Sequence, residues 1–460
     1  MRTTDNTKIL FDILKEKHPD EVPCLDDLQI LGNKKIKDIK PDENPNLLVF
    51  PSEWNAYHDD VDGSEIFSLS PDNVIETKNI MGFIGLNETN LTIASRFAES
   101  DNNDYFLHYM LQRVMAINVL DLKHSGGKND IWDFLVFLFP YFLNKALSQG
   151  LYKEYKRNEY NDANVRGVID VKRHFSVNIP FSGKVAYSAR EHNYDNPVLQ
   201  IIRHTIEYIK THKYNGILTA NTDTFSNINQ VTLATSGYNK NSRQKIIDIN
   251  KKKPVVHPYF IEYKALQRLC IRILSYEKIS SNNEKEKIHG ILFDGAWLWE
   301  EYLNTILRDL HFRHPSNKKK ENGYRLFEDG RRIYPDFVKE TETTIIADAK
   351  YKRMENYLRS DAGNGEGGFR RRDNSDYYQL MAYMLRFDSS KGCLIFPHQG
   401  EIKPVTKQIL KGMSGEAGDR KIVLLGFNIP QNTKNYTCFK GLMKKSEDQL
   451  CDYFKRLETG

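Results

Sequence analysis

The segment from Tyr334 to Lys352, YPDFVKETETTIIADAKYK, holds two carboxylates and a lysine at a spacing suited to phosphodiester chemistry. Asp336 ends one short apolar run, and Asp348 and Lys350 end the next. Hard cations such as Mg²⁺ bind one or two carboxylates and keep several waters, which leaves room for a phosphate oxygen. Such a metal polarises the phosphoryl group and lowers the pKa of a bound water. Lys350 could orient that water or offset charge in the transition state.

Two short strands are needed to bring these side chains together. The β-branched run 344–350 favours a strand, in which side chains alternate in direction. Asp348 and Lys350 then share one face, and the apolar residues that alternate with them face the core. The polar segment 339–343 has the length of a hairpin connection, which would fold Asp336 back towards Asp348.

Two helices are expected to carry further residues of the site. From Leu292 to Leu310, apolar residues recur at spacings of three and four, which marks an amphipathic helix. Glu300 lies at the edge of its apolar face, and we predict that it is an inward-facing third acid. Gln379 and Tyr383 are four residues apart and would stand on one face of a second helix. A lone Asp-x-Lys on a strand is common, so the prediction depends on the whole ordered set.

In this order the motifs resemble the PD-(D/E)xK nuclease signature, with the Q-xxx-Y addition of RecB-like members. The resemblance implies metal-dependent DNA cleavage by a C-terminal restriction-endonuclease-like core, a mixed β-sheet flanked by helices. The catalytic residues that it implies are Asp336, Asp348, Lys350 and Glu300. The implied ligands of Mg²⁺ or Mn²⁺ are Asp336, Asp348, Glu300 and Ala349. It further implies that Gln379 and Tyr383 position DNA.

Basic residues gather near the same motifs. Basic side chains that flank a carboxylate site would hold the backbone phosphates that the carboxylates repel. The residues expected to contact phosphate are Arg370, Arg371, Arg372 and Lys352. Solvated loops account for many such runs, so a plain surface loop stays open as an alternative.

Blocks upstream of the catalytic motifs resemble McrC, the nuclease subunit of McrBC restriction systems. With the motifs they span about residues 75–455, and they are Gly82–Leu86, Leu91–Ile93, Tyr105–Leu111, Gly150–Tyr155, Val165–Gly167 and Tyr194–Gln200. The chain departs from the family pattern where Ser95-Arg96 replaces the usual Pro-Lys and where Gln200 stands for a commoner Asn. The first seventy or so residues match no part of that pattern.

An McrC-like subunit acts with a separate AAA+ GTPase, McrB. The resemblance therefore implies two partners, a McrB-like AAA+ GTPase hexamer and double-stranded DNA, with GTP bound by the partner. The glycine-rich stretch 363–368 is not followed by a P-loop Gly-Lys-Ser/Thr, so nothing in this chain looks able to hydrolyse a nucleotide. The resemblance also implies that the amino-terminal region inserts into the GTPase ring and stimulates it. No residue is assigned to that stimulation by its sequence, and Arg166 and the polar stretch 219–253 are the candidates.

Two other functions stay open. A stand-alone RecB-like nuclease would cut DNA without a partner or nucleotide, and the long McrC-like region argues against it. A non-catalytic regulator of a GTPase ring would need no carboxylate site, and the intact set Asp336, Asp348 and Lys350 argues against that. The sequence does not indicate which DNA modification or sequence is recognised.

Length and composition suit a soluble α+β or α/β protein of two or three domains, because 460 residues exceed one ordinary core. We predict an accessory segment 1–74, a mixed α+β partner-binding region 75–279 and a nuclease domain 288–460. The net charge of +5 permits DNA binding without requiring it. The chain shows no apolar signal segment and no run long enough to span a membrane, so we expect a cytoplasmic protein without membrane contact. The five cysteines lack metal-site spacing.

The apolar patterns also predict individual elements. Helices are expected at 10–17, 104–117, 132–149, 197–213 and 257–276. Strands are expected at 47–50, 166–187, 393–396 and 422–425. The polar stretch 219–253 is expected to form an extended arm or a loop.

Overall fold

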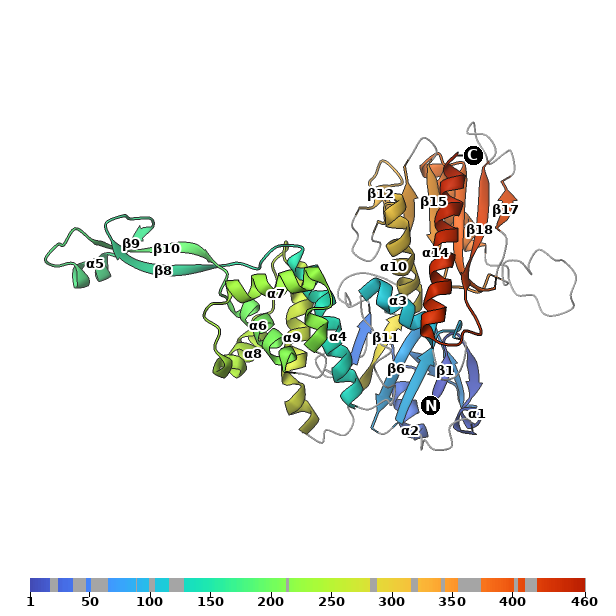
Figure 1. The fold of residues 1–460 in the computed structure, drawn as a ribbon, viewed down its shortest axis with the longest axis horizontal. Coiled ribbons are helices and arrows are strands. Elements are labelled where there is room, and N and C mark those ends of the chain that lie inside the picture. Colours follow the sequence, from blue (N-terminus) through green and yellow to red (C-terminus); the bar gives the residue numbers. More distant parts are fainter. Residues whose placement is uncertain are drawn as a thin grey trace, which may run out of the picture. The chain divides into compact units, whose positions relative to one another are not determined.

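The chain is a mixed α+β protein with two compact units, Met1–Gly126 with Glu284–Gly460, and Gly127–Asn283. The computed structural model (Figure 1) describes residues 1–16, 24–35, 47–50, 65–87, 89–98, 104–115, 128–211, 215–281, 288–315, 322–340, 344–354, 374–400, 404–409 and 420–459. Within these residues, no helix is both long enough and apolar enough to cross a bilayer.

The first unit contains a five-stranded sheet in the order β1-β7-β6-β11-β3. Its strands are β1 (Arg2–Thr4), β3 (Leu47–Phe50), β6 (Ile80–Leu86), β7 (Thr89–Ala94) and β11 (His289–Asp294). β6 runs antiparallel to both of its neighbours, whereas β1 and β3 pair parallel to theirs. A smaller sheet has the order β2-β5-β4, from β2 (Lys8–Leu10), β4 (Phe67–Leu69) and β5 (Val74–Thr77).

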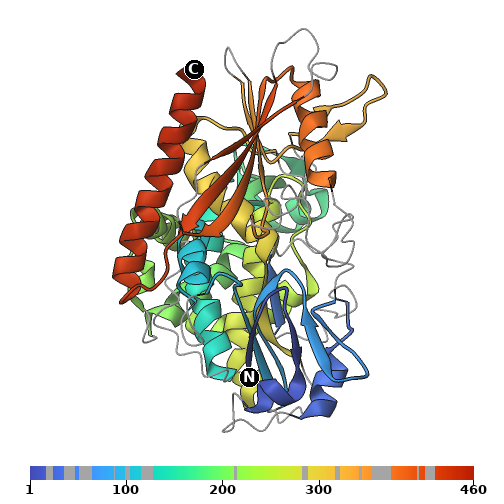
Figure 2. The same ribbon diagram turned by 90° about the vertical axis from the view of Figure 1, so that its right-hand side faces the viewer.

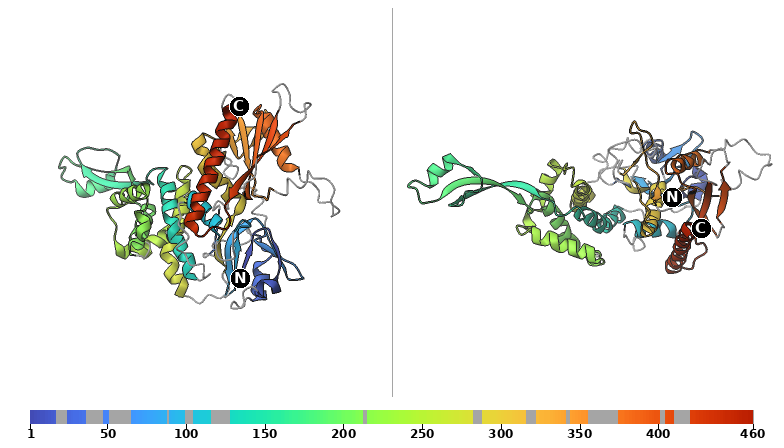
Figure 3. Two further views of the ribbon diagram at one scale, coloured as in Figure 1. Left: turned by 45° about the vertical axis from the view of Figure 1, so that its right-hand side comes forward. Right: turned by 90° about the horizontal axis from the view of Figure 1, so that it is seen from above.

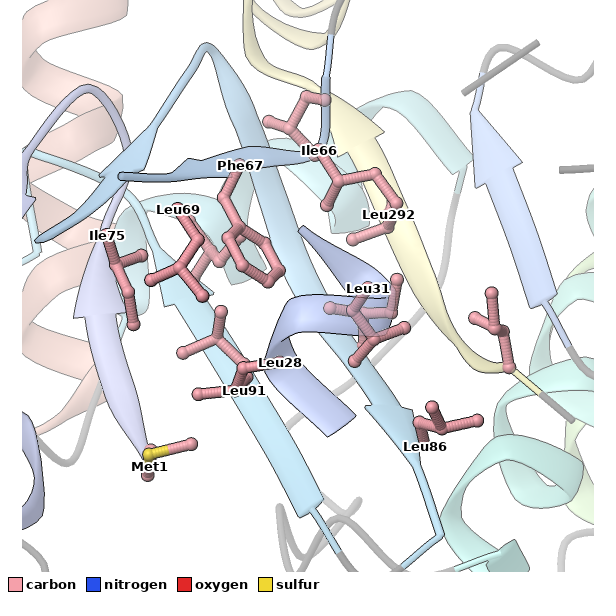
Figure 4. Packing of buried hydrophobic residues seen from close by; sticks show 14 of the residues in the cluster. Met1, Leu28, Leu31, Ile66, Phe67, Leu69, Ile75, Leu86, Leu91 and Leu292 are labelled. Carbon is pink, nitrogen blue, oxygen red and sulfur yellow. The ribbon is translucent and has the colours of Figure 1, made fainter. Parts of the chain in front are cut away.

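An apolar core fills the space beside these two sheets. The short helices α1 (Phe11–Glu16) and α2 (Leu25–Leu31) each contribute two buried apolar side chains to it. Leu28 and Leu31 of α2 lie among Phe67, Leu91 and Leu292 (Figure 4). The core therefore joins residues from the first seventy positions to a strand that begins at position 289.

Two glycines allow β6 and β11 to pair closely. Gly82 has a φ of +125° and Gly290 a φ of +151°, both in a region that residues with a side chain rarely adopt. A Cβ at Gly82 would lie 2.0 Å from the Ile291 carbonyl oxygen, and one at Gly290 would lie 2.3 Å from the Phe83 carbonyl oxygen. Both contacts are with backbone, which cannot move aside without breaking the sheet.

We expect Gly290→Ala to lower the free energy of unfolding by about 3–5 kcal/mol, the sum of backbone strain and an overpacked contact. Gly400→Ala is the matched control, because Gly400 also has a positive φ, +99°, but has no atom within 4 Å of the added Cβ. The control should lose only about 1 kcal/mol. Scanning calorimetry of both variants checks this, and equal losses would show that the close approach of the two strands is not the cause.

A second five-stranded sheet lies in the same unit, in the order β14-β15-β16-β18-β17. The strands are β14 (Phe337–Lys339), β15 (Ile345–Ala349), β16 (Lys391–Gln399), β17 (Val405–Gln408) and β18 (Lys421–Ile429). β15, β16 and β18 are parallel to one another, and the two edge strands run antiparallel. This confirms the mixed sheet and the strands predicted at 393–396 and 422–425.

Helices cover both faces of this sheet (Figure 2). On one face lies α12 (Ser375–Arg386), and on the other lie α10 (Gly295–Leu307) and α14 (Tyr436–Thr459), against which α3 (Tyr105–Met115) packs. Ile346 packs with Leu380 of α12, so the face that carries Asp348 is as buried as the opposite one. The residues predicted to face a core, Ile345 and Ala347, are buried as expected, and the burial of the opposite face is an addition to that prediction. A small hairpin, β12 (Tyr324–Arg325) with β13 (Arg332–Ile333), and the 3-10 turn η4 (Arg308–Leu310) complete the unit.

The second unit is a group of helices with a projecting β arm. The helices are α4 (Lys128–Leu147), α6 (Pro197–Lys210), α7 (Thr222–Ala234), α8 (Arg243–Lys252) and α9 (Ile261–Ser281), with the 3-10 turns η2 (Asn215–Leu218) and η3 (Lys240–Ser242). The arm consists of β8 (Glu154–Asp162) paired with β10 (Val185–Asn193), with β9 (Val168–Ile169) and α5 (Val171–Val177) at its tip. It extends well beyond the helices of its own unit (Figure 3).

Several predicted elements differ from the structure. The stretch 219–253 is helical, because asparagine side chains cap its helices; Asn221 accepts a hydrogen bond from the Asp223 N–H at 2.8 Å. The arm is formed instead by 154–193, where a strand had been predicted in place of helix α5. Leu292 belongs to β11, since Asp294 caps α10 and starts the helix at Gly295.

The compact units also differ from the three predicted segments. The predicted break at 280–287 coincides with the boundary between the units at Asn283 and Glu284. No boundary follows residue 74, because β11 pairs with β6 on one side and with β3 on the other. One strand from each predicted segment, β3, β6 and β11, is therefore hydrogen-bonded in one sheet of one unit.

Candidate active site

The hairpin of β14 and β15 brings the two carboxylates together. The pairs Phe337↔Ala347 and Val338↔Ile346 define an antiparallel register that places Asp336 opposite Asp348, one step beyond the last pair. The Ala349 N–H donates to Asp336 Oδ2 at 2.8 Å, which fixes the Asp336 carboxylate against the end of β15. The hairpin pairing was predicted from sequence and is confirmed; its connection at 341–343 lies outside the described residues.

Lys350 lies immediately after β15, where its N–H donates to the Ile395 carbonyl of β16 at 2.9 Å. Its ammonium group forms an ion pair with Asp348 Oδ2, and lies 3.6 Å from Asp376 Oδ1. The side chain of Asp348 is 1% exposed and that of Lys350 is 13% exposed, so this pair is shielded from bulk water. Its charges therefore interact more strongly than a surface pair would.

Helix α12 places a polar row beside the same point. Lys350 Nζ donates to Gln379 Oε1 at 3.1 Å, and Gln379 Nε2 donates to the Tyr383 hydroxyl at 2.9 Å. One turn earlier, the buried Asp376 accepts from Lys352 Nζ at 2.7 Å. The predicted pair Gln379 and Tyr383 thus lies on one helix face and is connected to Lys350 by hydrogen bonds.

Helix α10 brings Glu300 to the other side of the carboxylates. Asp294 begins the helix by accepting hydrogen bonds from the Ala296 and Trp297 N–H groups at 2.9 and 3.3 Å. The Glu300 side chain, one quarter exposed, lies on the edge of the buried helix face, where its charge acts on Asp336. Leu298 and Trp299, the two residues before Glu300, are buried and hold this orientation.

His314 connects Glu300 to the hairpin. Its Nδ1 donates to the Asp336 carbonyl oxygen at 2.7 Å, which requires a proton on that nitrogen. Its Nε2 lies 3.5 Å from Glu300 Oε1, and its ring stacks on Phe337 with centroids 5.1 Å apart. His314 thus contacts both acidic elements of the site.

The crowded acids have perturbed pKa values. Desolvation, together with the charge of Glu300, raises the pKa of Asp336 to about 7, although Lys350 and the Ala349 N–H oppose the shift. Desolvation and the charge of Asp336 raise the pKa of Asp348 well above its ordinary value. Burial alone would lower the pKa of Lys350, but the charges of Asp348 and Asp336 outweigh it and raise that pKa. A cation that binds both carboxylates would relieve this repulsion.

The donor set fits a hard divalent cation. The Lys350 ammonium pairs with Asp348 Oδ2, whereas the buried Asp348 Oδ1 accepts no hydrogen bond from a described residue. A buried acceptor without a donor is costly unless an ion or water satisfies it. Among the described residues, no group of three or more His, Cys, Asp or Glu side chains is arranged to hold a metal. Two carboxylates with a main-chain oxygen and waters suit Mg²⁺ or Mn²⁺ better than a closed zinc site.

The structure therefore brings together Asp336, Asp348, Lys350, Glu300, Ala349, Gln379, Tyr383 and Lys352. Arg370, Arg371 and Arg372 lie outside the described residues. Sequence reasoning missed Asp376 and His314. Asp376 carries a usable signal, because it precedes Gln379 by three and so shares its helix face. His314 has none, since it reaches the site only through the pairing of residue 313 with 338.

Comparison with known proteins assigns most of this sequence to one family. Residues 75–397 match the family model of the McrBC 5-methylcytosine restriction system component. A comparison with curated proteins finds no match.

Two solved structures are similar at low identity. One is a refined half-complex from a tetradecameric assembly of Thermococcus gammatolerans McrB AAA+ hexamers with bound McrC. It is 14% identical, covers 97% of this chain and 99% of the matched chain, and has a TM-score of 0.42. The other is the Thermococcus gammatolerans McrBC complex, at 14% identity, 69% and 89% coverage and a TM-score of 0.30.

Proposed function

Because this chain belongs to the McrBC 5-methylcytosine restriction system component family, we propose that it is the nuclease subunit of a McrBC-like restriction complex that cleaves foreign DNA. The observation that carries the proposal is the convergence of Asp336, Asp348 and Lys350 at the end of the β14–β15 hairpin. All three lie within the segment that matches the family. A mixed sheet between helices, with these residues at one strand end, is the arrangement that the PD-(D/E)xK resemblance implies.

The proposed reaction is hydrolysis of a DNA phosphodiester bond. Mg²⁺ or Mn²⁺, held by Asp336, Asp348 and the carbonyl of Ala349, with Glu300 at its outer side, would supply Lewis-acid polarisation of the phosphate. Lys350 stays protonated, because surrounding carboxylates raise its pKa, and it places a positive charge where negative charge develops on the phosphate. Gln379 accepts one Lys350 N–H and thereby orients the ammonium group.

We propose that basic residues next to the site hold the DNA backbone. Lys352 is 44% exposed, and its ion pair with Asp376 can exchange for one with a phosphate. Arg370, Arg371 and Arg372 follow in the chain between β15 and α12 and are proposed to make further phosphate contacts. The same contacts would be independent of base sequence, so they position the strand and leave recognition to other parts of the complex.

The proposed protein partner is a McrB-like AAA+ GTPase hexamer, which binds GTP while this chain does not. The tip of the arm, residues 165–181, exposes an unusual number of apolar side chains for a protein surface. They are between 39% and 73% exposed, and they are Val165, Val168, Ile169, Val171, Phe175, Val177, Ile179 and Phe181. An apolar tip at the end of a narrow arm suits insertion into the opening of a ring. The arm therefore replaces 219–253 as the proposed contact, and Arg166, held 5.2 Å from the Tyr160 ring centroid, lies on it.

We expect Phe175→Ser with Phe181→Ser to reduce stimulation of the partner's GTPase at least about tenfold, because each buried aromatic contributes more than 1 kcal/mol at an interface. Both side chains are more than half exposed in the free chain, so the thermal unfolding midpoint should stay unchanged. The matched control is Phe225→Ser, since Phe225 is 51% exposed on α7 of the same unit. The measurement is the rate of GTP hydrolysis by the partner in the presence of each variant. An equal loss of stimulation in the control would contradict the proposal that the arm makes the contact.

The function itself is tested by DNA cleavage with Mg²⁺, using methylated and unmethylated plasmid, with and without the AAA+ partner and GTP. Cleavage that needs both partner and GTP supports the proposal. Cleavage by the chain alone would indicate a stand-alone nuclease. GTPase stimulation without any cleavage would indicate a regulator of the ring.

A further inference from the structure

A buried tyrosine lies two residues beyond the strand that carries the active site. Tyr351 directly follows Lys350 and is 3% exposed. Its hydroxyl group lies 3.0 Å from Ser95 Oγ, and its ring packs edge-on against Phe97, with centroids 5.6 Å apart. Ser95 and Phe97 belong to the segment that follows β7 of the other sheet in this unit. The chain just after β15 is therefore anchored against a segment that leaves a different sheet.

A buried ion pair holds the surroundings of Tyr351. Arg96 Nε donates to Asp5 Oδ2 at 2.9 Å, and both side chains are almost fully buried. The Arg96 guanidinium also lies over the Tyr351 ring, 4.8 Å from its centroid. Breaking a buried pair by removing one partner is strongly destabilising, so these two residues fix each other in place. Arg353 adds to this by donating to the Arg96 carbonyl at 3.0 Å.

The same cluster contacts the start of helix α10. Asn79 accepts a hydrogen bond from the Arg96 side chain through Oδ1, and its carbonyl accepts one from the Gly295 N–H at 2.8 Å. The Tyr351 ring fills the space beside Gly295, where an added Cβ would lie 2.8 Å from Tyr351 Cε1. Helix α10 carries Glu300. One tyrosine thus touches the helix that presents Glu300 and adjoins Lys350 in the chain.

We propose that Tyr351, held by the ion pair of Asp5 and Arg96, is a positioning residue that sets Lys350 and Glu300 in the geometry for metal binding. The inference rests on the proposed function, because it takes these side chains to belong to a nuclease site. It assigns a role to Asp5, which lies outside the family-matched segment 75–397. It also accounts for Arg96, where the family pattern has lysine: a guanidinium can pair with Asp5 and stack on an aromatic ring at once.

The decisive variant is Arg96→Met, which keeps an unbranched side chain but removes the side-chain contacts with Asp5 and Asn79; the hydrogen bond from the Arg96 backbone N–H to Asp5 Oδ1 stays. We expect it to weaken Mn²⁺ binding, measured by titration calorimetry, about ten- to a hundredfold, as loss of an outer support of a metal site commonly does. Amide hydrogen exchange should accelerate at 348–352 and at the start of α10. Arg96→Lys should be intermediate, because it restores the charge without the planar fork.

Tyr351→Phe and its control Tyr109→Phe separate positioning from general stability. Tyr109 is equally buried in the same unit, and its hydroxyl donates to Glu447 Oε1 at 2.9 Å, away from Tyr351. We expect Tyr351→Phe to weaken Mn²⁺ binding severalfold and Tyr109→Phe to leave it unchanged, even where both lower the unfolding midpoint equally. This pair also decides the question if Arg96→Met does not fold.

The outcomes distinguish this inference from the proposed function. Unchanged Mn²⁺ affinity and unchanged exchange in Arg96→Met, or equal losses in the two tyrosine variants, would overturn the positioning role. A wild-type chain that binds Mn²⁺ but never cleaves DNA would overturn the nuclease and leave the positioning role standing. If the wild type bound no Mn²⁺, the proposed metal site would be wrong. Amide hydrogen exchange at 348–352 in Arg96→Met would then be the measurement that confirms or overturns the effect of Arg96 on this segment.

Discussion

Asp348→Asn is expected to lower the rate of DNA cleavage by a thousandfold or more, on the order of the largest losses from removing one charged group of an active site. Asparagine keeps the shape of the side chain but removes the charge that would bind a cation. It also leaves the Lys350 ammonium without its closest counter-ion. Stimulation of the partner's GTPase should be unaffected, because the arm belongs to the other compact unit.

The matched control for that change is Asp388→Asn. Asp388 forms an ion pair with Arg420 at 2.7 Å, but its own side chain is 78% exposed and lies outside the site. The Asp388→Asn variant should therefore cleave DNA at the wild-type rate. Single-turnover cleavage of a plasmid, with GTP hydrolysis measured in the same samples, checks both parts. Residual cleavage above a tenth of wild type in Asp348→Asn would exclude the carboxylate site described here.

Asp336→Asn is expected to destroy metal binding and yet to stabilise the metal-free protein at pH 8. Desolvation and Glu300 raise the pKa of Asp336 to about 7 in the folded state, from 3.8. Between about pH 4 and 7 the folded protein keeps a proton that the unfolded chain has released, so stability falls as pH rises through this window. The ionised carboxylate then costs up to about 4 kcal/mol above pH 7. Asparagine avoids this cost and can still accept the Ala349 N–H.

The measurement is the thermal unfolding midpoint from pH 5 to 8 in a chelator. The unfolding midpoint of the variant should exceed that of the wild type by up to about 4 °C at pH 8, and the difference should narrow as pH is lowered. Excess Mn²⁺ should raise the midpoint of the wild type alone, since ligand binding stabilises only the form that binds it. An Asp336→Asn variant that is less stable than wild type at pH 8 would show that the ionised Asp336 carboxylate does not destabilise the folded protein.

The hairpin and the Q-xxx-Y helix could be predicted because their signals are local. Asp348 and Lys350 sit two apart on a β-branched run, and Gln379 and Tyr383 sit four apart on an apolar helix. In the structure Lys350 forms an ion pair with Asp348 and donates a hydrogen bond to Gln379. Gln379 in turn donates one to Tyr383. Glu300 was placed correctly near Asp336 for the same reason, although its helix begins at Gly295 and not at Leu292.

The remaining features could not be predicted because they depend on partners far away in sequence. β11 reads as the start of a helix until its pairing with β6, more than two hundred residues earlier, is known. The polar stretch 219–253 reads as a loop, although its asparagines cap helices, because the same residues favour turns and helix starts. Asp5 carried no signal at all, since its connection to the site runs only through Arg96.

In the sequence, the unit Gly127–Asn283 lies between the two segments that form the other unit, and this order determines which strands can pair first during protein synthesis. β6 emerges from the ribosome with its antiparallel neighbour β7, but β11 cannot pair with it until the whole of Gly127–Asn283 has been translated. At about 5–20 residues per second, this delay is on the order of 10–40 s. The carboxylate hairpin is made later still. A nascent chain therefore carries its complete arm before residues 336–350, which form the carboxylate hairpin, have been translated.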